Sequence, residues 1–139
     1  MIKDITFGSD PEYFVKNEST GKIVSSIPVI DGTKETPESL GDGYFILQDN
    51  ILAEGNIPPS RTMEMFMYHM AELQKRMTQY IKSKYPVLGL HHDDCLDIDM
   101  AFLSHPDAMQ FGCSPYMNAW DGQEHRAGDL SSESFRTCG

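Results

Sequence analysis

The chain has 139 residues, a formal charge of −10 and 40% hydrophobic residues, among them seven Phe and nine Met. This composition excludes a collagen, a mucin stalk or a fully disordered tail, and the length suits a single domain over 1–139 with its own core. No apolar run approaches the ~18 residues of a membrane helix, so we expect no membrane partner.

Segments with strand character dominate the first part of the chain and predict an antiparallel sheet. The expected strands cover residues 2–7, 13–16, 22–30, 44–48 and 51–57. Between them we expect a break at 8–11, because a proline there cannot donate to a strand ladder, and turns at 17–21 and 49–50. Residues 31–43 carry three Gly and one Pro and predict a loop.

A long amphipathic helix is the clearest element that the sequence predicts. Its apolar stripe recurs at helical spacing and comprises Met63, Phe66, Met67, Met70, Leu73, Met77 and Ile81. Ser60 or Thr62 can cap the start of this helix, and Tyr85-Pro86 ends it. The Met-rich stripe fits either a groove for a partner or core packing against a sheet, and we expect core packing.

Beyond the helix the periodicity fades. Residues 87–90 predict a short strand and residues 106–110 a helical turn, and from Phe111 onward Gly, Ser, Asp and Asn dominate. Strands followed by one long helix and then irregular segments favour the α+β class, with an antiparallel sheet that the helix covers.

The negative charge is concentrated in two arms. Residues 1–56 carry ten acids and four bases (−6) and residues 91–139 nine acids and two bases (−7), whereas the helical stretch 57–90 carries two acids and five bases (+3). Without a basic stripe, nucleic acid is not an expected partner. The acidic excess fits solubility, a carboxylate cluster that holds a divalent metal, or a surface that mimics nucleic acid.

Asp10 and Glu12 are the first candidate metal ligands. Residues two apart in an extended chain point to the same face, so the two carboxylates would lie together, and a cation between them would relieve their repulsion. Oxygen ligands of this kind suit Mg²⁺ or Mn²⁺. The alternative is an Asp-Pro turn with a solvated Glu12.

Glu54 and Asn56 form a second polar pair. Both would lie on one face of the strand expected over 51–57, and that face is directed either to solvent or to a site. Gly55 between them would let a ligand or another backbone approach closely.

For the other histidines and cysteines that could be reactive, the sequence context favours structural roles. The run His91-His92-Asp93-Asp94-Cys95 has the composition of a metal site, but neighbours in a strand point to opposite faces, so we interpret it as a polar surface or loop. We expect His69 to be a surface histidine and Cys113 a small buried residue. Three cysteines without zinc-module spacing indicate a reduced, cytoplasmic compartment.

Arg126 and Arg136 are the only Lys or Arg residues of the acidic C-terminal arm. Each could neutralise a surface acid or bind a phosphate or carboxylate through two parallel hydrogen bonds. We favour surface neutralisation for Arg126, and for Arg136 both roles stay open.

Four segments stand in one order along nearly the whole chain. They are Phe7-Gly8-Ser9-Asp10-Pro11-Glu12, then Asp49-Asn50 with Glu54-Gly55-Asn56-Ile57-Pro58-Pro59, then Phe111-Gly112-Cys113-Ser114-Pro115-Tyr116-Met117-Asn118-Ala119-Trp120, then Phe135-Arg136-Thr137-Cys138-Gly139. Together they resemble the phage-type carboxylate–amine ligases (amidoligases), which are grouped with the glutamine synthetase and glutamate–cysteine ligase fold.

The resemblance implies a curved antiparallel sheet, part of a glutamine-synthetase-like catalytic domain, that binds ATP and Mg²⁺ or Mn²⁺ on its concave face. A carboxylate would be activated as an acyl phosphate, which an amine attacks to give an amide. As metal ligands the resemblance implies Asp10, Glu12 and Glu54. It assigns Asn56 and Arg136 to cofactor binding, and Arg136 also to catalysis, where it would steady a phosphate or the acyl phosphate.

In the family the Arg-x-x-Gly element leads into a Gly-His-x-His strand, whereas this chain ends at Gly139. We therefore expect the N-terminal part of such a ligase, inactive or nearly so alone, whose substrates would be a carboxylate and an amine on peptides or proteins. Exposed sheet edges would favour self-association. The alternative is a non-catalytic acidic phage protein that binds a host factor in the host cytoplasm.

Overall fold

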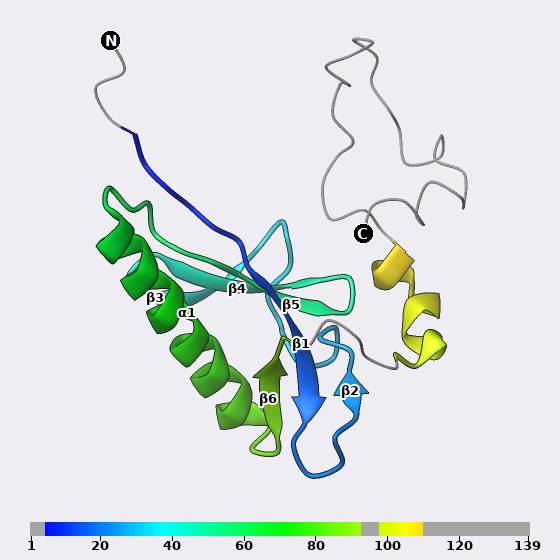
Figure 1. The fold of residues 1–139 in the computed structure, drawn as a ribbon. Helices are drawn as coiled ribbons and strands as arrows, with labels where there is room; N and C mark the ends of the chain where they lie inside the picture. Colours follow the sequence, from blue (N-terminus) through cyan, green and yellow to red (C-terminus); the bar gives the residue numbers. More distant parts are fainter. Residues whose placement is uncertain (1–4, 93–97, 110–139) are drawn as a thin grey trace, which may run out of the picture. The chain divides into compact units, whose positions relative to one another are not determined.

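The computed structural model describes residues 5–92 and 98–109, and its main elements are six strands and one long helix (Figure 1). The strands are β1 (Glu12–Asn17), β2 (Ile23–Val24), β3 (Glu38–Gly41), β4 (Tyr44–Asp49), β5 (Leu52–Asn56) and β6 (Leu88–His91). The helix is α1 (Met63–Lys84), and two short 3₁₀ helices follow, η1 (Met100–Ser104) and η2 (Pro106–Met109). These elements lie in the first of two compact units of the chain, and the single domain over 1–139 stays a prediction.

The strands form one curved antiparallel sheet with the order β2-β1-β5-β4-β3, to which β6 is added along β1. At the start of β1, Glu12 lies opposite Glu54 of β5. Further along, Val15 pairs with both Val24 of β2 and Leu90 of β6, so these two strands flank β1 on opposite sides. The expected α+β class, with an antiparallel sheet and one helix, is confirmed.

Helix α1 packs on one face of the sheet through the second half of its apolar stripe. Leu73, Met77 and Ile81 are fully buried there. A Cβ atom on Gly55 of β5 would lie 2.6 Å from Met77 Sδ and 2.9 Å from Leu73 Cδ1, so a glycine at this position lets the strand approach the helix closely. Core packing is therefore confirmed for these turns.

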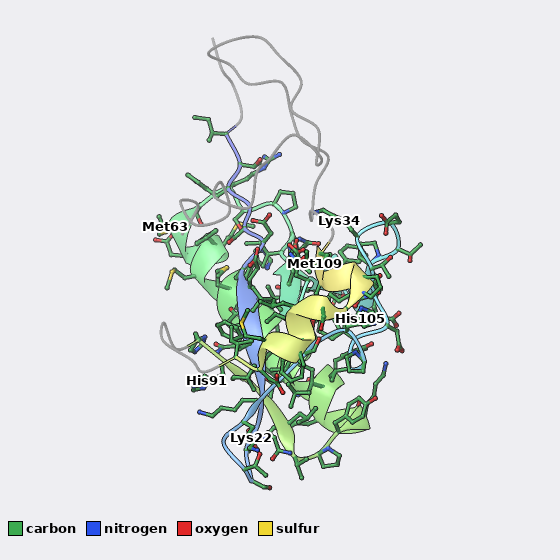
Figure 2. All side chains as sticks on the ribbon, turned by 90° about the vertical axis from the view of Figure 1, so that its right-hand side faces the viewer. Lys22, Lys34, Met63, His91, His105 and Met109 are labelled. Carbon is green, nitrogen blue, oxygen red and sulfur yellow. The ribbon has the colours of Figure 1, made fainter. Side chains whose placement is uncertain are left out.

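The first turns of α1 differ from that prediction. Met63 and Met67 are both 61% exposed, and Figure 2 shows Met63 at the start of the helix. Phe66 and Met70 of the same stripe pack only partly against the core. Helical periodicity marks the apolar side of a helix but not how far a sheet extends beneath it.

The start of α1 distinguishes the two expected capping residues. Thr62 Oγ1 accepts a hydrogen bond from the Met65 amide at 3.2 Å, so Thr62 is the N-cap. Ser60 is buried instead, and its backbone exchanges two hydrogen bonds with Phe7, of 2.7 and 2.8 Å. Of the strand expected over 2–7, the described residues keep only this bridge.

Two segments depart from the expected strand and loop. β2 stops at Val24 rather than continuing to residue 30, because the amides of Val29 and Ile30 both donate to the Ser26 carbonyl and close a turn. The loop expected over 31–43 contains β3, which pairs with β4 through a bulge. Gly41 and Gly43 of that segment take positive φ and mark the turn between these strands rather than the absence of a strand.

The later elements follow the predictions closely. β4 and β5 form the expected hairpin, and Asn50 takes the left-handed backbone conformation at its turn. β6 and η2 lie where a strand and a helical turn are expected, whereas η1 is not foreseen. Within the described part of the chain, α1 is not apolar enough to cross a bilayer, and no other helix is long enough.

Candidate metal site

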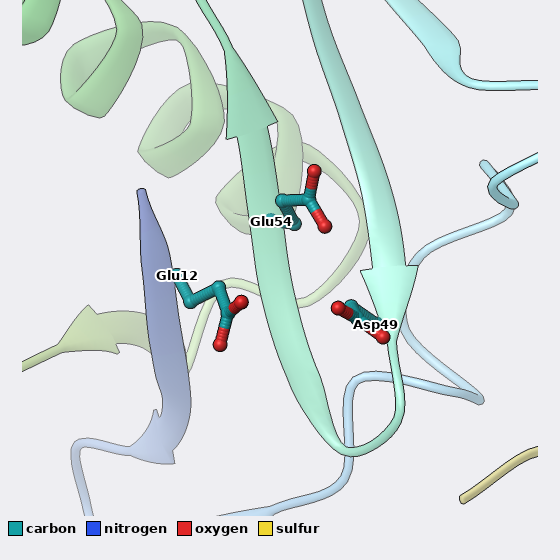
Figure 3. Close-up of side chains that lie close together, drawn as sticks. All are labelled: Glu12, Asp49 and Glu54. Carbon is teal, nitrogen blue, oxygen red and sulfur yellow. The ribbon is translucent and has the colours of Figure 1, made fainter. Parts of the chain in front are cut away.

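Three carboxylates from three neighbouring strands meet on one face of the sheet (Figure 3). Glu12 comes from β1, Glu54 from β5 and Asp49 from the end of β4, and each offers an oxygen within 4.8 Å of the others. At Gly55, the next residue along β5, a side chain would point toward α1. Because side chains alternate along a strand, we call the surface with Glu12, Asp49 and Glu54 the carboxylate face and the opposite one the helix face.

Strand register explains why these three side chains converge. Glu12 and Glu54 are directly opposite in the β1–β5 ladder, where Cβ atoms of paired residues lie about 5 Å apart. Asp49 lies opposite Leu52, two residues before Glu54 and therefore on the same face. The two-residue hairpin turn thus brings Asp49 beside the other two carboxylates.

The environment of the cluster disfavours ionised carboxylates. Glu54 is only 8% exposed, and its Oε1 accepts a hydrogen bond from Asn56 Nδ2 at 3.3 Å. Burial raises the pKa of Glu54; Asp49 and Asp10 raise it further, whereas the Asn56 hydrogen bond and Lys34 lower it. A positive charge at this place would therefore stabilise the ionised form.

Glu12 has a similar electrostatic environment, although its side chain is exposed. Partial desolvation of the carboxyl group, followed by the charges of Asp49 and Asp10, raises the pKa of Glu12, and Lys34 opposes the shift. Two glutamates on neighbouring strands therefore share the same sources of perturbation. Perturbed carboxyls that lie together are a common feature of functional sites.

The donor set fits a hard divalent cation. All three side chains supply carboxylate oxygens, which suit Mg²⁺, Mn²⁺ or Ca²⁺ rather than Zn²⁺ or copper. Three protein oxygens leave coordination positions for water or for the oxygens of a ligand. That arrangement is usual for Mg²⁺ that serves a phosphate-bearing substrate.

The structure places the predicted metal ligands unequally. It brings Glu12 and Glu54 together as expected, with Asn56 hydrogen-bonded beside them. Asp10 is exposed and lies outside the three-residue group, although its charge acts on both glutamates, so its role as a ligand stays a prediction. Asp49 is predicted as a turn residue, but the turn lies one residue later, at Asn50 and Ile51, so Asp49 ends β4 and shares a face with Glu54.

Other expected residues have different positions. Arg126, Arg136, Cys113 and the run Asp93-Asp94-Cys95 lie outside the described residues. His91 Nε2 lies 3.3 Å from Lys16 Nζ across the β1–β6 pair. The metal interpretation of the His91–Cys95 run gains no support from the described residues, among which the three carboxylates are the only such group.

The prediction that His69 is an ordinary surface histidine is wrong. Its ring is half-buried, and Nδ1 is hydrogen-bonded to the hydroxyl of Tyr44, a side chain that is 2% exposed. The ring also contacts Tyr68 edge-on, with centroids 5.6 Å apart. His69 lies beside the main apolar stripe of α1, and its contact with the sheet depends on how the helix is seated there.

Comparison with protein-family models, with curated proteins and with solved structures finds no match to this chain. The amidoligase resemblance therefore stays a prediction that rests on the four segments. The two segments within the described residues, 7–12 and 49–59, lie side by side. The Gly55 amide donates to the Pro11 carbonyl at 3.1 Å, and the Ile57 amide to the Ser9 carbonyl at 3.3 Å.

Proposed function

We propose that the chain binds Mg²⁺ or Mn²⁺ through Glu12, Asp49 and Glu54, and that this cation serves ATP in a carboxylate–amine ligase. The observation that carries the proposal is the convergence of three carboxylates from three strands on one face. The curved sheet would be part of a glutamine-synthetase-like catalytic domain. Its substrates would be a carboxylate and an amine on peptides or proteins.

Charge balance supports a cation at this place. Glu54 is more than nine-tenths buried, and among the described residues no Lys or Arg nitrogen lies within ion-pair distance of any of the three carboxylates. A buried carboxylate without a paired cation is costly, so it either takes up a proton or binds a metal ion. Metal binding would keep all three carboxylates ionised at neutral pH.

The residues have separate roles in this proposal. Glu12, Asp49 and Glu54 hold the cation, and the Asn56 amide orients Glu54 through its hydrogen bond. When bound, a divalent cation neutralises negative charge on phosphate oxygens. Asp10 as a further ligand, and Arg136 at the phosphate or acyl phosphate, remain parts of the proposal that follow from the resemblance.

Mn²⁺ titration of the full 139-residue chain, followed by the EPR signal of the free ion, tests the site. Wild type should bind Mn²⁺, and Glu54→Gln should weaken binding at least about tenfold because it removes a charged ligand. Glu64→Gln, in the first turn of α1, is the matched control and should bind as wild type does. Equal affinity of wild type and Glu54→Gln would overturn the metal site.

A thermal-shift titration with Mg-ATP tests the nucleotide part. Mg-ATP should raise the melting temperature of wild type and leave that of Glu12→Gln unchanged, because binding to the folded state alone stabilises it. The alternative, a non-catalytic protein that binds a host factor, predicts that Asp10 and Glu12 are dispensable for its interaction. Identical responses of wild type and Glu12→Gln would favour that alternative.

A further inference from the structure

A tightly closed turn holds Lys34 next to the strand that supplies Asp49. The Gly32 carbonyl accepts a hydrogen bond from the Gln48 amide at 2.9 Å, one residue before Asp49. A Cβ atom on Gly32 would lie 2.2 Å from the Ile46 carbonyl oxygen, so the backbone of the turn rests directly on β4. The position of Lys34 is therefore tied to the position of the carboxylate strand.

Threonine side chains close the same turn. The Thr33 amide donates to the Thr36 carbonyl at 3.1 Å, and the Thr36 amide donates to Thr33 Oγ1 at 3.2 Å. The two threonine hydroxyls are 3.0 Å apart, within hydrogen-bonding distance. Lys34 lies between them and is exposed, so the turn fixes its backbone and leaves its long side chain in solvent.

Lys34 influences the carboxylates without pairing with them. Its charge acts on both Glu12 and Glu54. Within residues 5–92 and 98–109, however, no carboxylate oxygen lies within 4.0 Å of its ammonium group. The ammonium group is therefore not bound to an oxygen of the cluster and is available to contact another anion.

We propose that Lys34 binds the phosphate oxygens of a polyphosphate held by the divalent cation at Glu12, Asp49 and Glu54, an inference that rests on the proposed function. Three carboxylates outweigh one divalent cation in charge, so the occupied site would still repel an anion. The ammonium group of Lys34, carried by the turn against β4, would supply the missing positive charge. A lysine is a common phosphate-binding residue because its compact charge contacts several oxygens.

The proposal makes cation and polyphosphate binding interdependent. Without a polyphosphate, Lys34 repels the incoming cation, whereas with one it attracts the anion that the cation carries. A lysine that merely balances the carboxylates would affect the cation alone. The two roles are separated by measuring Mn²⁺ alone and tripolyphosphate in the presence of Mn²⁺.

The experiment uses the full chain with Lys34→Met, Lys34→Arg and the control Lys22→Met. Figure 2 shows Lys22 and Lys34 at opposite ends of the described part. In calorimetric titrations at saturating Mn²⁺, Lys34→Met should weaken tripolyphosphate binding roughly tenfold or more. Its affinity for Mn²⁺ alone should be unchanged or up to about threefold tighter, because a nearby positive charge is gone.

The other variants complete the test. Lys34→Arg keeps the charge and should retain tripolyphosphate affinity within about threefold of wild type, and Lys22→Met should bind as wild type does. Equal tripolyphosphate affinity of Lys34→Met and wild type would overturn the role of Lys34 but not the proposed metal site. The same holds if wild type binds Mn²⁺ but no tripolyphosphate. Failure of wild type to bind Mn²⁺ would overturn the proposed function and this inference with it.

Discussion

The two faces of the sheet are built from the same strands but have opposite chemistry. On the helix face, Ala53 and Ile46 are fully buried and Gly55 lies against α1. On the carboxylate face, the intervening residue Glu54 meets Glu12 of the neighbouring strand. Each step of one residue along β5 therefore passes from the hydrophobic core to the candidate site.

This alternation makes the carboxylate face dependent on the helix face. A shift of β5 by one residue would expose Ala53 and bury Glu54 against α1, so packing of the core selects the register that brings the carboxylates together. Within that register the two faces should respond differently to substitution. The stability of the fold depends mainly on the helix face, and metal affinity on the carboxylate face.

The largest expected effect is on the helix face, at Leu73. Leu73→Ala leaves a cavity at a fully buried position and should lower the free energy of unfolding by about 3 kcal/mol, measured by urea denaturation. Met67→Ala, on the same helix but 61% exposed, should change it by less than about 0.5 kcal/mol.

Mn²⁺ affinity completes that comparison. Under conditions in which Leu73→Ala is still folded, the Mn²⁺ affinity of this variant should stay within about threefold of that of wild type, because no ligand has moved. A larger loss would show that the two faces are not separable.

A smaller effect of opposite sign is expected at Gln48. It lies opposite Ala53 and so on the helix face. Among the described residues its Oε1 is the one buried side-chain nitrogen or oxygen atom without a hydrogen-bond partner. Gln48→Met should raise the free energy of unfolding by about 1 kcal/mol, because it removes this unpaired acceptor. The backbone hydrogen bond from Gln48 to Gly32 is unaffected.

Gln79→Met, at an exposed position of α1, is the matched control and should leave stability within about 0.5 kcal/mol of wild type. A destabilised Gln48→Met with an unchanged control would mean that Oε1 has a partner after all, such as an ordered water.

The smallest expected effect is the pH dependence that the carboxylate face produces. The pKa of Glu54 in the folded state is raised from its ordinary value of 4.5. The folded state then binds more protons than the unfolded chain, so stability is highest below that value and is lost as pH rises through the raised pKa. In EDTA, wild type should therefore lose more stability than Glu54→Gln between about pH 4 and about pH 7.

Divalent cation should reverse this loss in wild type, because it stabilises the ionised form. Added Mn²⁺ should therefore restore stability at neutral pH in wild type but not in Glu54→Gln. Glu64→Gln should follow wild type under both conditions. Parallel pH curves for wild type and Glu54→Gln would contradict the assigned environment of this carboxyl group.

The local elements were largely predictable from local chemistry. The Asp49-Asn50 pair between two apolar segments predicted the hairpin of β4 and β5, although the turn lies one residue later, at Asn50 and Ile51. Helical spacing with a possible threonine cap and a following proline predicted α1. The strand β3 and the early end of β2 were missed. In both cases hydrogen bonds to distant or turn residues outweighed the local pattern.

Alternation and periodicity are local properties, and they predict Asp10 and Glu12 as candidate ligands, Glu54 on a face that could form a site, and a helix that covers a sheet. The role of Glu54 as a ligand follows from the family resemblance. The pairing of β1 with β5, which sets Glu12 opposite Glu54, depends on tertiary packing. Tertiary packing also brings Asp49 to the group and the turn that carries Lys34 against β4. Strand register between distant segments depends on how the whole core packs, and a linear pattern does not contain that information.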